Sequence, residues 1–81
     1  METETIEKDI IHFLENNILS EGIKIFPDSS LREVGIDSFS IVEIILFIER
    51  KYDIVIPDHK LIPDNFKTIH TIALTVKELG N

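Results

Sequence analysis

The chain contains no cysteine, and in only 81 residues this absence limits the possible folds more than any other feature. A domain of this size buries only about 60% of the surface that its unfolded chain exposes, so disulfide bonds often reinforce such small cores. Without a thiol, the chain lacks disulfides, cysteine-ligated zinc, iron–sulfur clusters and a cysteine nucleophile together. We therefore expect residues 1–81 to form one compact domain with a single apolar core.

Apolar residues recur at helical spacing in three segments. The first helix is expected over roughly residues 3–18, from the spacing of Ile6, Ile10, Phe13 and Leu14, and its early acidic residues suit the helix dipole: Glu2, Glu4 and Glu7. The second is expected over about 38–52, with Asp37 as its N-cap. Thr68 can cap a third helix that ends before Gly80 and has one apolar face: Ile69, Ile72, Ala73, Val76 and Leu79. The pattern predicts an all-α fold.

Two connections join these helices. Residues 19–36 form a long first loop whose apolar residues we expect to pack on the bundle: Ile23, Ile25, Phe26, Leu31, Val34 and Ile36. Within it, Ser30 and Glu33 have capping-box spacing for one short helical turn. The connection from 57 to 67 contains two prolines and predicts a turn with at most one short helix. The expected architecture is a small four-helix bundle of three long helices and one short helix.

The charge distribution excludes several classes of partner. With eight basic and 15 acidic residues the net charge is −7, and only Arg50 and Lys51 are adjacent basic residues, so we expect no binding to nucleic acid or anionic lipid. The longest apolar run, residues 44–48, is far shorter than the roughly 20 residues of a membrane span, so we expect no membrane insertion. The acidic start, METET, is unlike a signal or transit peptide, and a cytoplasmic location is expected.

The second helix carries two apolar stripes. At about 100° per residue, one side holds Ile41, Ile44, Ile45, Ile48 and Tyr52. The opposite side holds Phe39, Val42 and Leu46, accompanied by Glu43 and Arg50. A helix in so small a bundle usually buries one stripe. The second stripe is either covered by the short helix or the long loop, or exposed as a docking surface.

The start of this helix suits an attached anion. Gly35 permits a sharp turn of the chain, and Ser38 falls in the first helical turn. A phosphate on Ser38 would meet free backbone N–H groups and the positive end of the helix dipole. The simpler interpretation is that Ser38 only helps Asp37 to cap the helix.

Two segments stand out by their motifs: residues 31–39, LREVGIDSF, and residues 52–57, YDIVIP. In motif and spacing they resemble the acyl carrier protein family. The family has a hydrophobic residue, glycine and Asp-Ser-hydrophobic at the start of its second helix, followed later by an aromatic-Asp segment that ends in Ile-Pro. With the first helix and the Thr68-Ile69 start of the last, the resemblance covers nearly the whole chain.

The resemblance implies a four-helix bundle of the acyl-carrier type and a carrier that is not itself an enzyme. Ser38 would carry phosphopantetheine through a phosphodiester and hold acyl or aminoacyl groups as thioesters, for fatty acid, polyketide or related biosynthesis. Asp37 would contact the phosphopantetheinyl transferase that attaches this arm. Further partners would be a loading ligase or transferase and downstream biosynthetic enzymes, which dock on the second helix at Phe39, Val42, Glu43 and Leu46. This favours exposure of the second stripe, which is formed by Phe39, Val42 and Leu46 and is called the outer stripe below. The carrier is expected to be a monomer.

Some residues depart from the fatty-acid members of that family. Phe39 replaces the common leucine, Ser40 replaces an often acidic residue, and Arg50 and Lys51 stand where such carriers tend to be acidic. These differences indicate a specialised partner. The Asp-Ser-Phe motif and the long 57–67 segment look like those of D-alanyl carrier proteins and of some aminoacyl or secondary-metabolism carriers.

Other chemistry finds little support in the sequence. Ser38 lies outside a G-x-S-x-G motif, and Asp37 cannot replace a histidine base, which argues against a hydrolase and leaves no catalytic residue. His12, His59 and His70 stand singly, without metal-ligand spacing, so no metal site is expected. A second hypothesis is a small helical adaptor that binds a partner through the exposed stripe without a prosthetic group.

Overall fold

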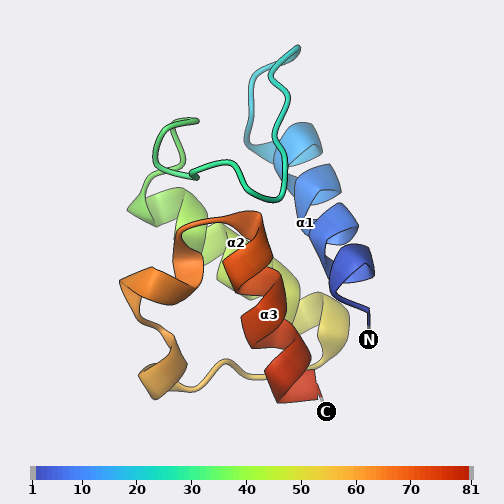
Figure 1. The fold of residues 1–81 in the computed structure, drawn as a ribbon, viewed down its shortest axis with the longest axis vertical. Helices are drawn as coiled ribbons and strands as arrows, with labels where there is room; N and C mark the ends of the chain where they lie inside the picture. Colours follow the sequence, from blue (N-terminus) through green and yellow to red (C-terminus); the bar gives the residue numbers. More distant parts are fainter. Residues whose placement is uncertain (1, 81) are drawn as a thin grey trace.

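The computed structural model describes residues 2–80 and contains three α-helices and two short 3₁₀ helices in that range (Figure 1). The elements in chain order are α1 Thr3–Asn17, α2 Ser38–Tyr52, η1 Asp58–Lys60, η2 Pro63–Phe66 and α3 Ile69–Gly80. The expected bounds of α2 are confirmed. Gly80, expected just beyond the last helix, is instead its final residue.

The expected short fourth α-helix is absent from the described range. At its place in the first connection, the Glu33 N–H donates to Ser30 Oγ at 3.3 Å and the Val34 N–H donates to the Ser30 carbonyl at 3.2 Å. This single turn cannot continue, because Gly35 has a φ of +91° and redirects the chain into α2. The second connection holds two 3₁₀ helices where at most one short helix was expected; Pro63 starts η2 with its fixed φ.

The helices enclose one apolar core. Figure 1 shows α2 (green to yellow) running behind α3 (red), with α1 (blue) beside them, and α1 packs against both α3 and α2. The buried apolar residues come from all three helices and from the connections: Ile6, Ile10, Leu14, Ile25, Leu31, Ile36, Ile44, Ile48, Ile56, Ile69, Ile72, Ala73 and Val76. One apolar face of each helix therefore meets the others in the core.

The first connection is packed in part. Backbone bonds tie it to the start of α3: the Leu31 N–H donates to the Lys67 carbonyl and the His70 N–H to the Pro27 carbonyl, both at 3.0 Å. Ile25 is buried, but Ile23 and Phe26, which we expected to pack on the helices, are 41% and 65% exposed. Only one side of this segment faces the bundle, and Ile25 occupies that side.

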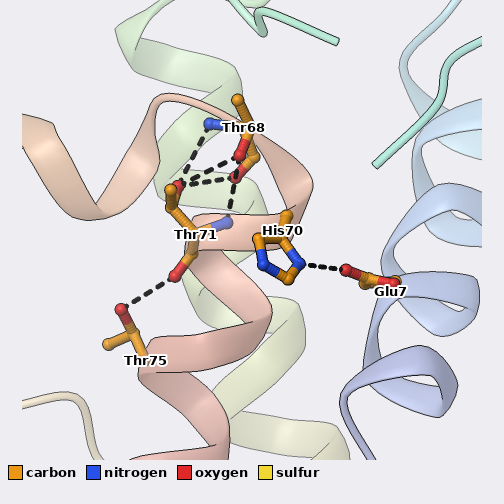
Figure 2. A network of polar contacts seen from close by, with 5 residues as sticks. All are labelled: Glu7, Thr68, His70, Thr71 and Thr75. Carbon is orange, nitrogen blue, oxygen red and sulfur yellow. Dashed lines mark hydrogen bonds and ion pairs between the residues drawn. The ribbon is translucent and has the colours of Figure 1, made fainter. Parts of the chain in front are cut away.

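Polar contacts join α1 to α3 (Figure 2). Glu7 is buried, and its Oε2 lies 2.6 Å from His70 Nδ1. Glu7 therefore pairs with a specific side chain on α3, whereas the sequence suggested only a favourable charge near the helix start. Thr68 caps α3 as expected: the Thr71 N–H donates to Thr68 Oγ1, and the Thr68 N–H donates in return to Thr71 Oγ1. No helix within residues 2–80 has the length and apolar composition needed to cross a bilayer.

Candidate functional site

The start of α2 is built by a glycine turn and a side-chain cap. After the turn at Gly35, Asp37 adopts an extended conformation and its Oδ1 accepts a hydrogen bond from the Ser40 N–H at 2.9 Å. The backbone hydrogen bond from Ser40, with a further contribution from its side chain, holds the pKa of the Asp37 carboxyl below its ordinary value of 3.8. The carboxylate is therefore ionised at neutral pH and fixes the first turn of α2.

Ser38 is the first residue of α2 and is exposed. The cap bond belongs to Asp37, and the side-chain hydrogen bonds found among residues 2–80 do not involve the Ser38 hydroxyl. Ser38 is thus not required for the observed cap. Its hydroxyl stands in solvent at the N-terminal end of a 15-residue helix, where an attached anion is stabilised by the backbone N–H groups and the helix dipole.

An open groove of about 1120 Å³ begins beside Ser38. It lies between the turn that precedes α2, the first half of α2 and the segment through η2. Its lining is mainly apolar: Leu31, Ile36, Ile41, Ile45, Leu61, Ile62, Pro63 and Phe66. Three charged residues also line it: Arg32, Asp37 and Lys67. Ile45, which the helical wheel placed in the core, is only partly buried and belongs to this groove wall.

The sequence pattern did not identify the far wall of the groove. Leu61 and Ile62 come from a connection that was expected to hold a turn and at most one short helix, and Thr68 was predicted only as a helix cap. A signal was present in retrospect: Leu61 and Ile62 are adjacent apolar residues in an otherwise polar, proline-containing segment. They are 41% and 45% exposed, so they contribute little to the core. They border the space next to Ser38 instead.

The outer stripe of α2 is exposed. Phe39 is 73% exposed, Val42 52% and Leu46 50%, whereas Ile44 and Ile48 on the opposite side are fully buried. Neither the 3₁₀ helices nor the long first connection covers these three residues, which answers the question that the sequence left open. Glu43 is half-buried on the same face, and Arg50 is exposed near its end. Ser38, the apolar stripe and these two charges therefore occupy one accessible surface.

The three histidines lie in different surroundings. His12 and His59 are exposed, and His70 contacts Glu7. Across the described part of the chain, no group of three or more His, Asp or Glu side chains is arranged to hold a metal ion.

Comparison with known proteins identifies relatives over most of the chain. The family model for the phosphopantetheine attachment site matches residues 17–76. The chain is 28% identical over 69 residues to aminoacyl carrier protein 2 of Bradyrhizobium diazoefficiens, a match that covers 84% of this chain and 75% of the relative. It is 32% identical over 63 residues to aminoacyl carrier protein 1 of the same organism, covering 78% and 68%. The acyl carrier protein of Bdellovibrio bacteriovorus is 29% identical over 76 residues, covering 86% and 95%.

Solved structures extend this similarity to the fold. A chain in the crystal structure of Bradyrhizobium japonicum glycine:[carrier protein] ligase complexed with its cognate carrier protein and an analogue of glycyl adenylate matches with a TM-score of 0.75 and 29% identity. That match covers 94% of this chain and 96% of the other. A chain in the complex of the ligase with glycylated carrier protein matches with a TM-score of 0.73 and 29% identity, over 90% and 96%.

Proposed function

Since the chain belongs to the family of carrier proteins defined by the phosphopantetheine attachment site, we propose that it is an aminoacyl carrier protein whose arm is attached to Ser38. Members of this family are not catalysts; they are substrates of the enzymes that load them. The observation that carries the proposal is the position of Ser38, exposed at the start of α2 between the groove and the apolar stripe.

The residues around Ser38 fit a phosphodiester-linked arm. The hydroxyl is accessible, its helix position favours the negative charge of a phosphodiester, and the adjoining groove can accept an extended chain with both apolar and polar groups. When bound, the arm supplies a terminal thiol that holds the cargo as a thioester. Ser38 contributes the hydroxyl oxygen: it loses its proton and would bond to the phosphorus of the arm, while the bond from this phosphorus to the phosphate of the donor nucleotide breaks and that nucleotide leaves. Asp37 keeps the first turn of α2 in place and presents a carboxylate to the transferase.

Partner enzymes would dock on the exposed face of α2. Phe39, Val42 and Leu46 offer apolar contact, and Glu43 offers an anionic contact to a basic entrance. Such docking is weak, and the tether then raises the effective concentration of the cargo inside the partner's site. Loading and unloading therefore require no catalytic residue on the carrier.

Two observations support aminoacyl cargo over a fatty acyl chain. The relatives include aminoacyl carrier proteins, and the similar solved structures contain a glycine:[carrier protein] ligase. In the same direction, Phe39, Arg50 and Lys51 differ from the residues expected of a fatty-acid carrier. The proposed partners are a phosphopantetheinyl transferase, an ATP-dependent aminoacyl ligase and an enzyme that removes the aminoacyl group.

Intact-mass measurement tests the attachment site. Co-expression with a broad-range phosphopantetheinyl transferase should add the mass of one arm to the wild-type protein and to Ser40→Ala, but not to Ser38→Ala. Ser40 is the matched control because it is two residues away, about 200° around the helix. An arm on Ser38→Ala would overturn the site, and an unmodified wild-type protein would favour the adaptor hypothesis. Incubating the holo-protein with an aminoacyl ligase, ATP and amino acids then tests the cargo, and a holo-protein that gains no aminoacyl mass would contradict the aminoacyl assignment.

A further inference from the structure

The exposed face of α2 carries two opposite charges in one line. Phe39, Glu43, Leu46 and Arg50 are spaced at i, i+4, i+7 and i+11, so they follow one another along a single side of the helix. Phe39 and Leu46 are at least half exposed, and Arg50 is exposed beyond them. Glu43 and Arg50 are two helical turns apart, about 10 Å along the axis. The face thus runs from an anionic half near Ser38 to a cationic end.

Within residues 2–80, neither Glu43 nor Arg50 forms an ion pair. The ion pairs formed among residues 2–80 join Lys60 to Glu78, Lys67 to Asp64 and His70 to Glu7. Glu43 and Arg50 are too far apart to pair with each other. A partner that covers this face removes water from both groups, and the loss is offset only where the partner places an opposite charge against each.

The position of Arg50 makes this requirement selective. The net charge of −7 attracts basic surfaces from a distance. A uniformly basic docking surface would, however, bring a positive group against Arg50 once it lay along the whole helix. Like charges brought together at an interface disfavour binding and so discriminate between partners.

We propose that Arg50 is a specificity residue for the loading ligase, and that the docking surface of this ligase is basic opposite Glu43 and acidic opposite Arg50. This inference rests on the proposed function and assigns the kind of partner that fits the face. It also explains how an acidic carrier can reject the uniformly basic partners that its net charge attracts.

Lys51 provides a matched control. It is exposed, adjacent to Arg50 and in the same last turn of α2, so the change Lys51→Glu alters net charge and helix-dipole interactions by the same amount as Arg50→Glu. Lys51 faces elsewhere, because it lines a small hollow with Asp9, His12 and Phe13 of α1. A difference in loading between Arg50→Glu and Lys51→Glu therefore shows that the position of the charge on the helix matters, and not the net charge alone.

The test is a competition for one loading activity. Equal amounts of holo wild type and one holo variant are mixed in an extract of the organism that encodes the protein, with ATP and amino acids, and the aminoacylated masses are compared at early times. Arg50→Glu should be loaded about tenfold less than wild type, whereas Arg50→Lys and Lys51→Glu should stay within about twofold. The disadvantage of Arg50→Glu should shrink as salt screens the contact.

The outcomes separate this inference from the proposed function. If Arg50→Glu is loaded as well as wild type or better, the proposed acidic contact opposite Arg50 is wrong. If Lys51→Glu loses as much loading as Arg50→Glu, the effect depends only on overall charge. Both results would leave aminoacyl loading intact. Absence of any aminoacylation on wild-type holo-protein would contradict the proposed function, and the role of Arg50 would fail with it.

Discussion

The hydroxyl of Tyr52 near the end of α2 donates a hydrogen bond to the Asp9 carboxylate on α1, with 2.5 Å between the oxygen atoms. The two residues are 43 positions apart, and the bond fixes the far end of α2 against α1. Burial raises the pKa of the Tyr52 hydroxyl well above its ordinary value of 10.0, and the hydrogen bond and charge of Asp9 raise this pKa further. The folded state therefore favours the neutral phenol.

This contact predicts an alkaline loss of stability. The unfolded chain loses the phenolic proton first, so the contribution of Tyr52 is present below pH 10.0 and declines as pH rises from there toward the higher folded pKa. Tyr52 is the only tyrosine and the chain has no tryptophan, so phenolate absorbance reports this group alone. We expect phenolate to appear only together with unfolding, and Tyr52→Phe to lack this component of the alkaline destabilisation. A folded protein whose phenolate titrates near its ordinary pKa would contradict the assignment.

A second prediction concerns Glu7 and His70. Because Glu7 is buried, His70→Ala leaves its carboxylate without its histidine partner and should lower the free energy of unfolding by about 1–3 kcal/mol. The same His70→Ala change in a Glu7→Leu background should cost under about 1 kcal/mol, since no carboxylate remains to be satisfied. Urea unfolding of the four proteins measures the coupling. Additive losses would show that the contact contributes nothing beyond packing.

The two sides of α2 should respond differently to truncation. Ile48 is fully buried, so Ile48→Ala should leave a cavity and lower the free energy of unfolding by about 2–5 kcal/mol. Val42 is 52% exposed, and Val42→Ala should cost under about 1 kcal/mol while slowing loading by partner enzymes. Chemical denaturation and loading rates test both statements. Similar, large losses of stability in the two variants would mean that the outer stripe is packed in solution.

The sequence was most informative where one physical requirement decided the outcome. Asp37 was predicted as the cap of α2 because its side chain can accept from the first turn, and the expected bounds of α2 and the cap at Thr68 are confirmed for similar reasons. Helical geometry placed Phe39, Val42 and Leu46 on one stripe, and the resemblance to carrier proteins favoured its exposure, which the structure shows. Local preferences and spacing carry this information directly.

Features that depend on contacts between residues distant in the sequence could not be predicted from local pattern and spacing. Glu7 looks like an ordinary acidic residue near a helix start, and only the position of α3 brings His70 to it. Ile45 has the periodicity of a core residue, yet the path of the 57–67 connection leaves it on a groove wall. The exposure of Phe26 likewise depends on which side of the first connection faces the bundle.

The cap at Asp37 predicts an acid-sensitive contribution to stability. Its folded pKa is lowered from 3.8, so the contribution is complete above the unfolded pKa and is lost as pH falls through the folded pKa. Asp37→Asn keeps an oxygen for the Ser40 N–H but does not titrate. Melting temperatures of wild type and Asp37→Asn should differ at about pH 7 and converge toward about pH 2. A difference that stays constant over this range would show that the ionised carboxylate adds nothing to the cap.

The last prediction concerns electrostatic steering at Glu43. This residue lies between Ser38 and Leu46 on the exposed face of α2, so a partner with a basic entrance is attracted to it before close contact forms. Glu43→Lys should change the free energy of unfolding by under about 1 kcal/mol but slow loading about threefold to tenfold at low salt. Raising the salt concentration should narrow the difference between Glu43→Lys and wild type, because exposed charges are screened over roughly 8 Å at physiological ionic strength.

Glu15→Lys on α1 makes the same change in net charge at an exposed position on another helix and should load like wild type. Stopped-flow or turnover measurements across a salt series check these expectations. Rates that ignore both salt and the charge at residue 43 would mean that docking depends on Phe39, Val42 and Leu46 through apolar contact alone.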